Sequence, residues 1–312
     1  MVMPSAAGQK ERSVIRMSRI DLHMHTLFSD GTCQPEELVG VAYDQGLDAI
    51  AITDHDNTGC LERARQAAAD KAAASEDKRE MEIIPGIEIN TVWTEYGHQE
   101  VHVLGYYINP DDENLKSVIN RHKQARVEQI QEIAQKLRDV ASVNVQYDDI
   151  VAHAAGSLSI GRPHVAKAIV QKGGAATISD AFNRFLNSSS PTYVRRATVS
   201  PHEAVEAIYE SGGIAVIAHP KEMEHIEELV VDLMNYGLRG LEAYHKSHSP
   251  AIIEFHSSLA EKYGLIVTGG TDFHGPAENY PKTLGNWRMP DFVYAKLKAE
   301  SQMIQESGYK AS

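Results

Sequence analysis

The sequence predicts an α/β fold in which parallel strands alternate with helices and a small helical segment is inserted. Two regions, before about residue 110 and after about residue 199, alternate short apolar runs with amphipathic helices, which is typical of a parallel sheet. Between them the strand signal fades and apolar residues recur at helical spacing. The 312 residues, 42% of them apolar, suffice for one large domain with an insertion.

The first region follows a polar, aperiodic segment, residues 1–18, which we expect to be a flexible N-terminal tail. Proline in a first helical turn and glycine just after a last one mark the helix boundaries. The expected elements are a strand from Ile20, a helix at residues 35–46, a strand at 49–53, an alanine-rich helix at 60–74 and a strand at 82–87.

The second region repeats this pattern with a helix after Ser200 and Pro201, strands in the runs IAVIAH, GLEAYH and LIVTGG, and a helix near residues 252–263. Between the two regions, residues 111–198 predict several helices. Helical spacing is evident at Leu115, Val118, Ile119, Ile130, Ile133 and Leu137, and again in the stretches RPHVAKAIVQKG and ISDAFNRFL.

Composition and charge exclude several classes of protein. The apolar runs are far shorter than the roughly 20 residues of a membrane helix, and the N-terminal segment lacks the apolar core of a signal peptide, so we expect a cytoplasmic protein. Cys33 and Cys60 are too few for a disulfide framework and are expected to be free thiols. The net charge of −13 argues against duplex nucleic-acid binding.

The run IDLHMHTLFSDGT places three polar side chains on one face of a strand. Residues two apart share a face, so Asp21, His23 and His25 project together while Leu22 and Met24 project the other way. Burying these groups unpaired would cost several kcal/mol each. These side chains therefore either face water or are collected at the mouth of the fold, as a metal ion would do.

Similar side chains follow almost every expected strand. A single histidine at a strand end is usually a solvated loop residue, but repetition at seven stretches favours a metal site, since the carboxyl ends of barrel strands converge on one face. The residues are His23, His25, Asp30, Asp54, His55, Asp56, Glu88, His102, His219, Glu242, His245, Asp272 and His274.

The ordered motifs DLHMHTLFSDGT, AITDHD, PGIEIN, HVLGYY, GIAVIAHP and GGTDFHG resemble the PHP (polymerase and histidinol phosphatase) family of metal-dependent phosphoesterases. The stretches IGRPHVAKAIV and TYVRRATVSPHEAVEAI resemble the branch that acts on nucleotides and short RNA. The resemblance implies a distorted (β/α)7 barrel, formed by residues 19–110 and 199–312. The mostly helical insertion, residues 111–198, would shape the substrate pocket.

The resemblance also implies two or three divalent ions of Mn, Fe or Zn and no organic cofactor. Three ions with three carboxylates would give the site a charge of about +3, enough to attract phosphate to an acidic protein. The implied ligands are His23, His25, Glu88 and Asp272 for a first ion, Asp30, His55 and Glu88 for a second, and His102, His219 and His274 for a third. We expect Asp21, Asp54 and Asp56 to orient imidazoles instead.

The expected reaction is hydrolysis of a phosphomonoester or terminal phosphodiester by a metal-bridging hydroxide, with Asp272 essential and His245 protonating the leaving oxygen. Arg162, at the start of a helix, is expected to bind a second phosphate. Further candidate substrate contacts are His164, Arg195, Arg196, Lys221 and His245. The remaining histidines, His98, His122, His153, His202, His225, His248 and His256, are expected at the surface.

Alternative functions remain open at this point. A histidinol-phosphate phosphatase would not need the insertion with Arg162. A non-catalytic PHP module would have lost some of the metal ligands, whereas this sequence has all nine. A metal-dependent amidohydrolase on a similar barrel would show a carbamylated lysine or another ligand order. The expected partner is therefore a small phosphorylated molecule, a nucleotide or a short RNA end, and not a membrane.

Overall fold

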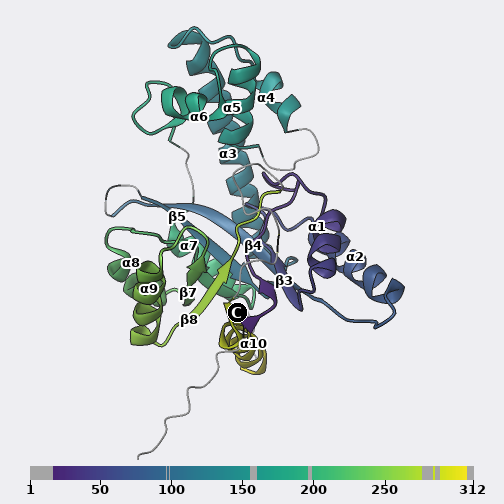
Figure 1. The fold of residues 1–312 in the computed structure, drawn as a ribbon. Helices are drawn as coiled ribbons and strands as arrows, with labels where there is room; N and C mark the ends of the chain where they lie inside the picture. Colours follow the sequence, from purple (N-terminus) through teal and green to yellow (C-terminus); the bar gives the residue numbers. More distant parts are fainter. Residues whose placement is uncertain are drawn as a thin grey trace, which may run out of the picture.

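A computed structural model describes residues 17–95, 97, 99–154, 160–195, 199–275, 284 and 289–307. Its centre is a seven-stranded sheet in the order β2-β3-β4-β5-β6-β7-β8, curved into a nearly closed barrel (Figure 1). The strands are β2 (Ile20–Asp21), β3 (Ala49–Ile52), β4 (Glu82–Trp93), β5 (Gln99–Tyr106), β6 (Ile214–Ile217), β7 (Leu238–His245) and β8 (Ile266–Gly270). The predicted α/β barrel is confirmed.

The expectation that all strands are parallel is wrong at β5, which runs antiparallel to both neighbours. Residues 94–98 are the whole connection between β4 and β5, and a parallel pair needs a crossover of a dozen or more residues. The other neighbouring pairs are parallel. His102 therefore enters the site from within an antiparallel strand.

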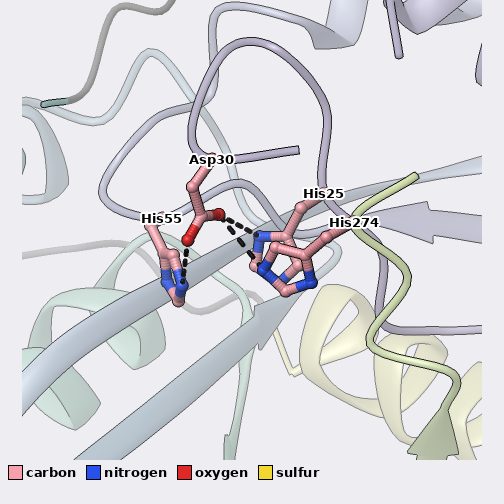
Figure 2. Close-up of side chains that lie close together, drawn as sticks. All are labelled: His25, Asp30, His55 and His274. Carbon is pink, nitrogen blue, oxygen red and sulfur yellow. Dashed lines mark ion pairs between the residues drawn. The ribbon is translucent and has the colours of Figure 1, made fainter. Parts of the chain in front are cut away.

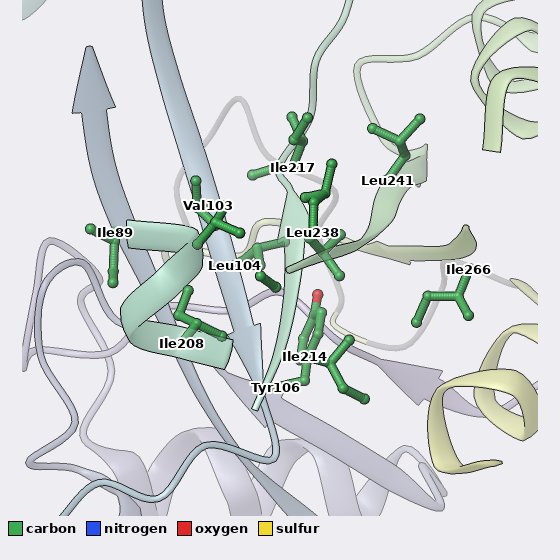
Figure 3. Packing of buried hydrophobic residues seen from close by; sticks show 14 of the residues in the cluster. Ile89, Val103, Leu104, Tyr106, Ile208, Ile214, Ile217, Leu238, Leu241 and Ile266 are labelled. Atoms are coloured by element: carbon green, nitrogen blue, oxygen red, sulfur yellow. The ribbon is translucent and has the colours of Figure 1, made fainter. Parts of the chain in front are cut away.

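Apolar side chains fill the space between the strands and the outer helices. In Figure 3, Ile208 of α7 belongs to the same buried cluster as Val103 and Leu104 of β5. The helices around the barrel are α1 (Pro35–Asp44), α2 (Leu61–Ala74), α7 (Pro201–Glu210), α8 (Ile226–Met234), α9 (Pro250–Tyr263) and α10 (Asp291–Glu306). Their apolar faces cover the sheet, so the strand ends are left to carry the polar residues.

Two short strands form a separate small sheet. β1 (Met17–Ser18) pairs antiparallel with β9 (Met289–Pro290). Met17 and Ser18, expected in the N-terminal tail, thus belong to regular structure, whereas residues 1–16 lie outside the described part of the chain.

A long helix links the barrel to the inserted segment. The apolar side chains of α3 (Glu113–Asp139) divide between two cores: Leu115, Val118 and Ile119 pack with the barrel, and Ile130 and Ile133 with the insertion. The insertion also contains α4 (Tyr147–His153), α5 (Arg162–Gln171), α6 (Ile178–Ala181) and the π-helical turn η1 (Phe182–Leu186). Within the described ranges, no helix combines the length and apolar character needed to cross a membrane.

The barrel closes where β8 meets the segment after β2. The His25 amide donates to the Phe273 carbonyl at 2.8 Å, and a Cβ added to Gly270 would lie 2.4 Å from the His23 amide nitrogen. Glycine is therefore required at position 270.

Gly270→Ala should destabilise the protein by about 3 kcal/mol or more, because the added methyl meets backbone that has no room to move. Denaturant unfolding would measure the change. Gly40→Ala on α1 is the matched control, since its Cβ would meet only the flexible end of Lys71 at 3.4 Å and alanine favours a helix by about 0.5–1 kcal/mol. Equal unfolding free energies for the two variants would contradict this account of the closure.

Candidate active site

Glu88 lies at the centre of the polar cluster at one end of the barrel. It belongs to β4 and is fully buried. Its carboxylate oxygens lie close to nitrogens of several predicted ligands: His23 (3.2 Å), His25 (3.2 Å), His55 (3.1 Å), His102 (2.8 Å) and His219 (3.0 Å). Segments far apart in the sequence thus converge on one carboxylate.

Two further carboxylates flank this centre. Asp272 Oδ1 lies 3.4 Å from His25 Nε2, and Asp30 Oδ1 lies 3.2 Å from His274 Nε2. Figure 2 shows Asp30 facing His25, His55 and His274. The structure therefore brings together all nine residues predicted as metal ligands.

The grouping of these residues differs from the expected one at His274. It lies with His25, Asp30 and His55, and not with His102 and His219 in a third group. The Thr32 amide donates to the His274 carbonyl at 2.8 Å, which holds the loop after β8 against the loop after β2. His102 and His219 instead approach Glu88 from β5 and the end of β6.

The chemistry of the cluster fits divalent metal ions. His23 Nε2 and His25 Nε2 face each other at 3.2 Å. Asp30 Oδ1 and His55 Nδ1 are buried close to other cluster atoms, yet neither makes a well-aligned hydrogen bond to the described part of the chain. Imidazole nitrogens and carboxylate oxygens that converge in this way are the donors that Mn, Fe and Zn accept.

The pKa values show how strongly the buried charges of this centre interact. Burial would lower the pKa of His25, but hydrogen bonds to Asp272 and Glu88 raise it to about 10. Burial would likewise raise the pKa of Glu88, yet the neighbouring histidines, His55 and His23 foremost, hold it well below its usual value. At His55, by contrast, burial lowers the pKa to about 3, so positive charge is stabilised at His25 and not at every imidazole of the cluster.

The groups that support the cluster are partly those expected. Glu242 is buried in β7, lies 3.1 Å from His23 Nδ1 and accepts the His219 amide at 2.8 Å. Asp21, expected to orient an imidazole, instead accepts the amide and hydroxyl of Thr271 at 2.9 and 2.6 Å. That expectation is wrong because the carboxylate faces the backbone of the next loop.

Asp54 and Asp56 contact the loops and helices around the cluster. Asp54 accepts the Ser29 hydroxyl at 2.6 Å, and Ser29 Oγ lies 3.3 Å from His25 Nδ1. Asp54 therefore reaches a ligand ring only through a hydroxyl. Asp56 pairs with Arg126 of α3, so it ties the loop that carries His55 to this helix.

His245 and Lys246 lie beside Asp272. His245 Nε2 is 3.6 Å from Asp272 Oδ2, and the Ser247 amide donates to His245 Nδ1 at 3.2 Å, which favours a proton on Nε2. Lys246, which sequence reasoning missed, donates to the Asp272 carbonyl at 2.6 Å. Its position in the sequence, directly after the strand-end histidine His245, could have indicated that it lies at the site.

A cavity of about 630 Å³ opens between the cluster and the insertion. Asp30, His55 and His102 line it on the barrel side, and Arg162 and Arg195 are also part of its wall. Aromatic surface comes from Phe182 and Tyr193. Arg162 also pairs with Glu100 at 3.0 Å, and Arg196 lies outside the described residues.

His164 does not belong to the described wall of this cavity. Its Nδ1 accepts the Gly161 amide at 3.0 Å at the start of α5, and burial lowers its pKa to about 4. The structure thus gives this side chain a contact within the helix terminus.

Three histidines expected at the surface are buried: His122, His248 and His256. His248 accepts the Lys221 amide at 3.1 Å and His256 donates to the Lys221 carbonyl at 2.8 Å. Lys221 itself lines a second cavity of about 670 Å³ with His219 and Ser247. At His248 and His256, imidazole nitrogens satisfy buried backbone groups, which explains the error at these two positions, whereas His122 Nδ1 lies 3.5 Å from Asp56 Oδ1. His98 lies outside the described residues.

Arg126 is the main site residue that sequence reasoning missed. It is 9% exposed and lines the 630 Å³ cavity. The sequence feature that could have revealed Arg126 is a charged residue on the apolar face of α3, four residues after His122 and four before Ile130.

Comparisons with known proteins agree with this geometry. The family model described as PHP domain matches residues 21–188. The chain is 31% identical to the 3′,5′-nucleoside bisphosphate phosphatase of Chromobacterium violaceum, over 84% of this chain and 89% of the relative. It is 30% identical to a 5′-3′ exoribonuclease of Haemophilus influenzae, over 83% of this chain and 90% of the relative.

Two solved structures are similar over nearly their whole length. One, from Bifidobacterium adolescentis, is described as a metal-dependent phosphoesterase and has a TM-score of 0.78 at 29% identity, covering 91% of this chain and 96% of that one. The other, described as an amidohydrolase from Chromobacterium violaceum with bound sulfate, has a TM-score of 0.77 at 28% identity, covering 91% and 97%.

Proposed function

Since this chain belongs to the PHP domain family and is a phosphate-ester hydrolase, we propose that it releases phosphate or a mononucleotide from a small nucleotide or a short RNA end. The observation that carries this proposal is the cavity that joins the cluster to Arg162 and Arg195. Guanidinium groups bind phosphate, and Phe182 and Tyr193 offer surfaces on which a base can stack.

We infer that the nine clustered residues hold two or three divalent ions of Mn, Fe or Zn. When bound, such ions supply a hydroxide nucleophile near neutral pH and stabilise charge on the phosphate oxygens. Glu242 orients His23 through Nδ1. His245 holds a proton at Nε2 for the leaving oxygen, with its ring fixed by Ser247.

A substrate panel tests this function. We expect phosphate or nucleotide release from a nucleoside 3′,5′-bisphosphate or a 5′-phosphorylated oligoribonucleotide in the presence of Mn²⁺. Histidinol phosphate should be a poor substrate because it offers no second phosphate to the arginines. Preference for histidinol phosphate, or hydrolysis of amides alone, would overturn the proposal.

Arg162→Ala should lower kcat/KM on a nucleoside bisphosphate by roughly 10²-fold, equivalent to about 2–3 kcal/mol of charged hydrogen bonding. Activity on p-nitrophenyl phosphate, which has no second phosphate, should hardly change. Steady-state kinetics on both substrates would measure this.

The matched control is Arg184→Ala, because Arg184 is an exposed arginine of the insertion that pairs with Asp180. It should leave both activities unchanged. Equal losses on both substrates for the Arg162 variant would place Arg162 at the reacting phosphate, and no loss would make it an ordinary surface charge.

A further inference from the structure

A second cavity reaches the polar cluster beside the first one. Its volume is about 670 Å³, and His102 and His219 are part of its wall. His102 and Glu100 line the 630 Å³ cavity as well, so the two cavities meet at the start of β5. Both histidines approach the Glu88 carboxylate, at 2.8 and 3.0 Å. A phosphodiester bound at the cluster can therefore extend into both cavities, one on each side of its phosphorus.

The charged side chains around the second cavity nearly cancel one another. Glu100 pairs with Arg162 at 3.0 Å, and Lys221 and Glu222 are adjacent, exposed residues of opposite charge. Among the described residues of this wall, Lys221 is the only lysine or arginine. The electrostatic potential of the cavity is therefore set by the ions that the cluster would hold, and these ions favour phosphate groups.

The backbone of Lys221 is held by two buried imidazoles. The Lys221 amide donates to His248 Nε2 at 3.1 Å, and the Lys221 carbonyl accepts from His256 Nε2 at 2.8 Å. His248 and His256 are 6% and 0% exposed. Lys221 has a φ of 51°, a left-handed conformation that is unfavourable for a residue with a Cβ, and the two hydrogen bonds stabilise it. The loop after β6 thus presents its lysine from a fixed backbone.

The contacts of His248 define which ring nitrogen carries its proton. Nδ1 donates to the Ala243 carbonyl at 2.8 Å, so Nε2 is left to accept from the Lys221 amide. Burial lowers the pKa of His248 to about 4, which keeps the ring neutral near pH 7. Ala243 belongs to β7, which ends at His245, and Ser247, which lies 2.7 Å from His245 Nδ1, also lines the second cavity. Lys221 is therefore fixed to the same strand end as the proposed proton donor.

We propose that the second cavity binds the part of an RNA chain beyond the phosphate being hydrolysed, with Lys221 contacting the next phosphate of the chain. The inference rests on the proposed function and deepens it, because it assigns a subsite to substrates longer than one nucleotide. The first cavity holds the terminal nucleotide, and the chain continues past His102 into the second cavity. His248 and His256 are positioning residues for Lys221.

Two substrates separate the cavities in steady-state kinetics on the metal-loaded protein. A nucleoside 3′,5′-bisphosphate ends at the reacting phosphate, whereas a short 5′-phosphorylated oligoribonucleotide continues beyond it. Lys221→Gln should lower the ratio of kcat/KM for the oligonucleotide to kcat/KM for the bisphosphate by about 10-fold, as one charged contact predicts. The slope of log kcat/KM against log salt concentration should become shallower by about 0.7 for the oligonucleotide. Lys221→Arg should retain both values.

The positioning role is tested at His248. His248→Leu should lower the same ratio, whereas His248→Gln, whose amide both donates and accepts, should retain most of it. Circular dichroism would establish that each variant is folded, and the exposed Lys221 variants test the subsite even if a His248 variant does not fold. Lys262→Ala is the matched control, because Lys262 is an exposed lysine of α9 that pairs with Glu227. It should leave the ratio and the salt dependence unchanged.

Equal losses on the two substrates in Lys221→Gln, or no loss on either, would overturn the subsite. So would a wild-type protein that hydrolyses the bisphosphate but not the oligonucleotide. Failure of the wild type to hydrolyse any phosphate ester would instead reject the proposed function.

Discussion

Asp272→Asn should lower turnover by roughly 10³-fold or more in metal-replete buffer, while the protein remains folded. Asp272 lies 3.4 Å from His25 and from His274, and we propose it as a metal ligand, whose loss would remove several kcal/mol of charge stabilisation. Asparagine is chosen because residue 272 has a φ of 49°, and asparagine tolerates this left-handed conformation. Phosphate release and denaturant unfolding would measure the two effects.

Asp272→Ala should lose as much activity and in addition about 1 kcal/mol of stability, since alanine is disfavoured at this φ. Asp44→Asn is the control: Asp44 is exposed on α1 and pairs with Lys71, so its loss should change neither quantity much. Near wild-type turnover in the asparagine variant would remove Asp272 from the site.

The cluster could be predicted from the sequence because several of its members occupy the same kind of position, just after a strand. His23, His55, His219 and Asp272 each come two or three residues after the end of a buried strand, and the strands of one barrel bring such positions together whatever the loop conformation. This argument needs only strand periodicity. It failed at β5, whose direction depends on a short connection that strand patterns alone do not reveal.

The partners of individual side chains depend on contacts between distant segments, which no local pattern encodes. Asp56 meets Arg126 across 70 residues of sequence, and His256 meets the Lys221 carbonyl across 35. The same holds for His274, whose neighbours are set by the closure of β8 against β2. Composition could not distinguish these buried groups from surface charges.

Glu88→Gln should have the largest effect, a loss of about 10⁴-fold in kcat/KM together with loss of bound metal. Its carboxylate meets imidazoles from the strands on both sides of β4, with His55 after β3 at 3.1 Å and His102 of β5 at 2.8 Å among them. Glutamine keeps the shape but removes the charge and turns a donor toward the ligand nitrogens. Metal content by mass spectrometry and kinetics would be compared on the same preparations.

Glu242→Gln tests whether the effect of Glu88→Gln comes from loss of a metal ligand or merely from replacing any buried carboxylate. Both carboxylates are fully buried and both contact His23, Glu88 at Nε2 and Glu242 at Nδ1. Because Glu242 orients the ring without reaching the centre of the cluster, its variant should keep its metal ions and lose only about 10–100-fold in activity. If the Glu242 variant lost its metal and the Glu88 variant retained it, the two carboxylates would exchange roles, and the metal centre would have to be placed on the Glu242 side of His23.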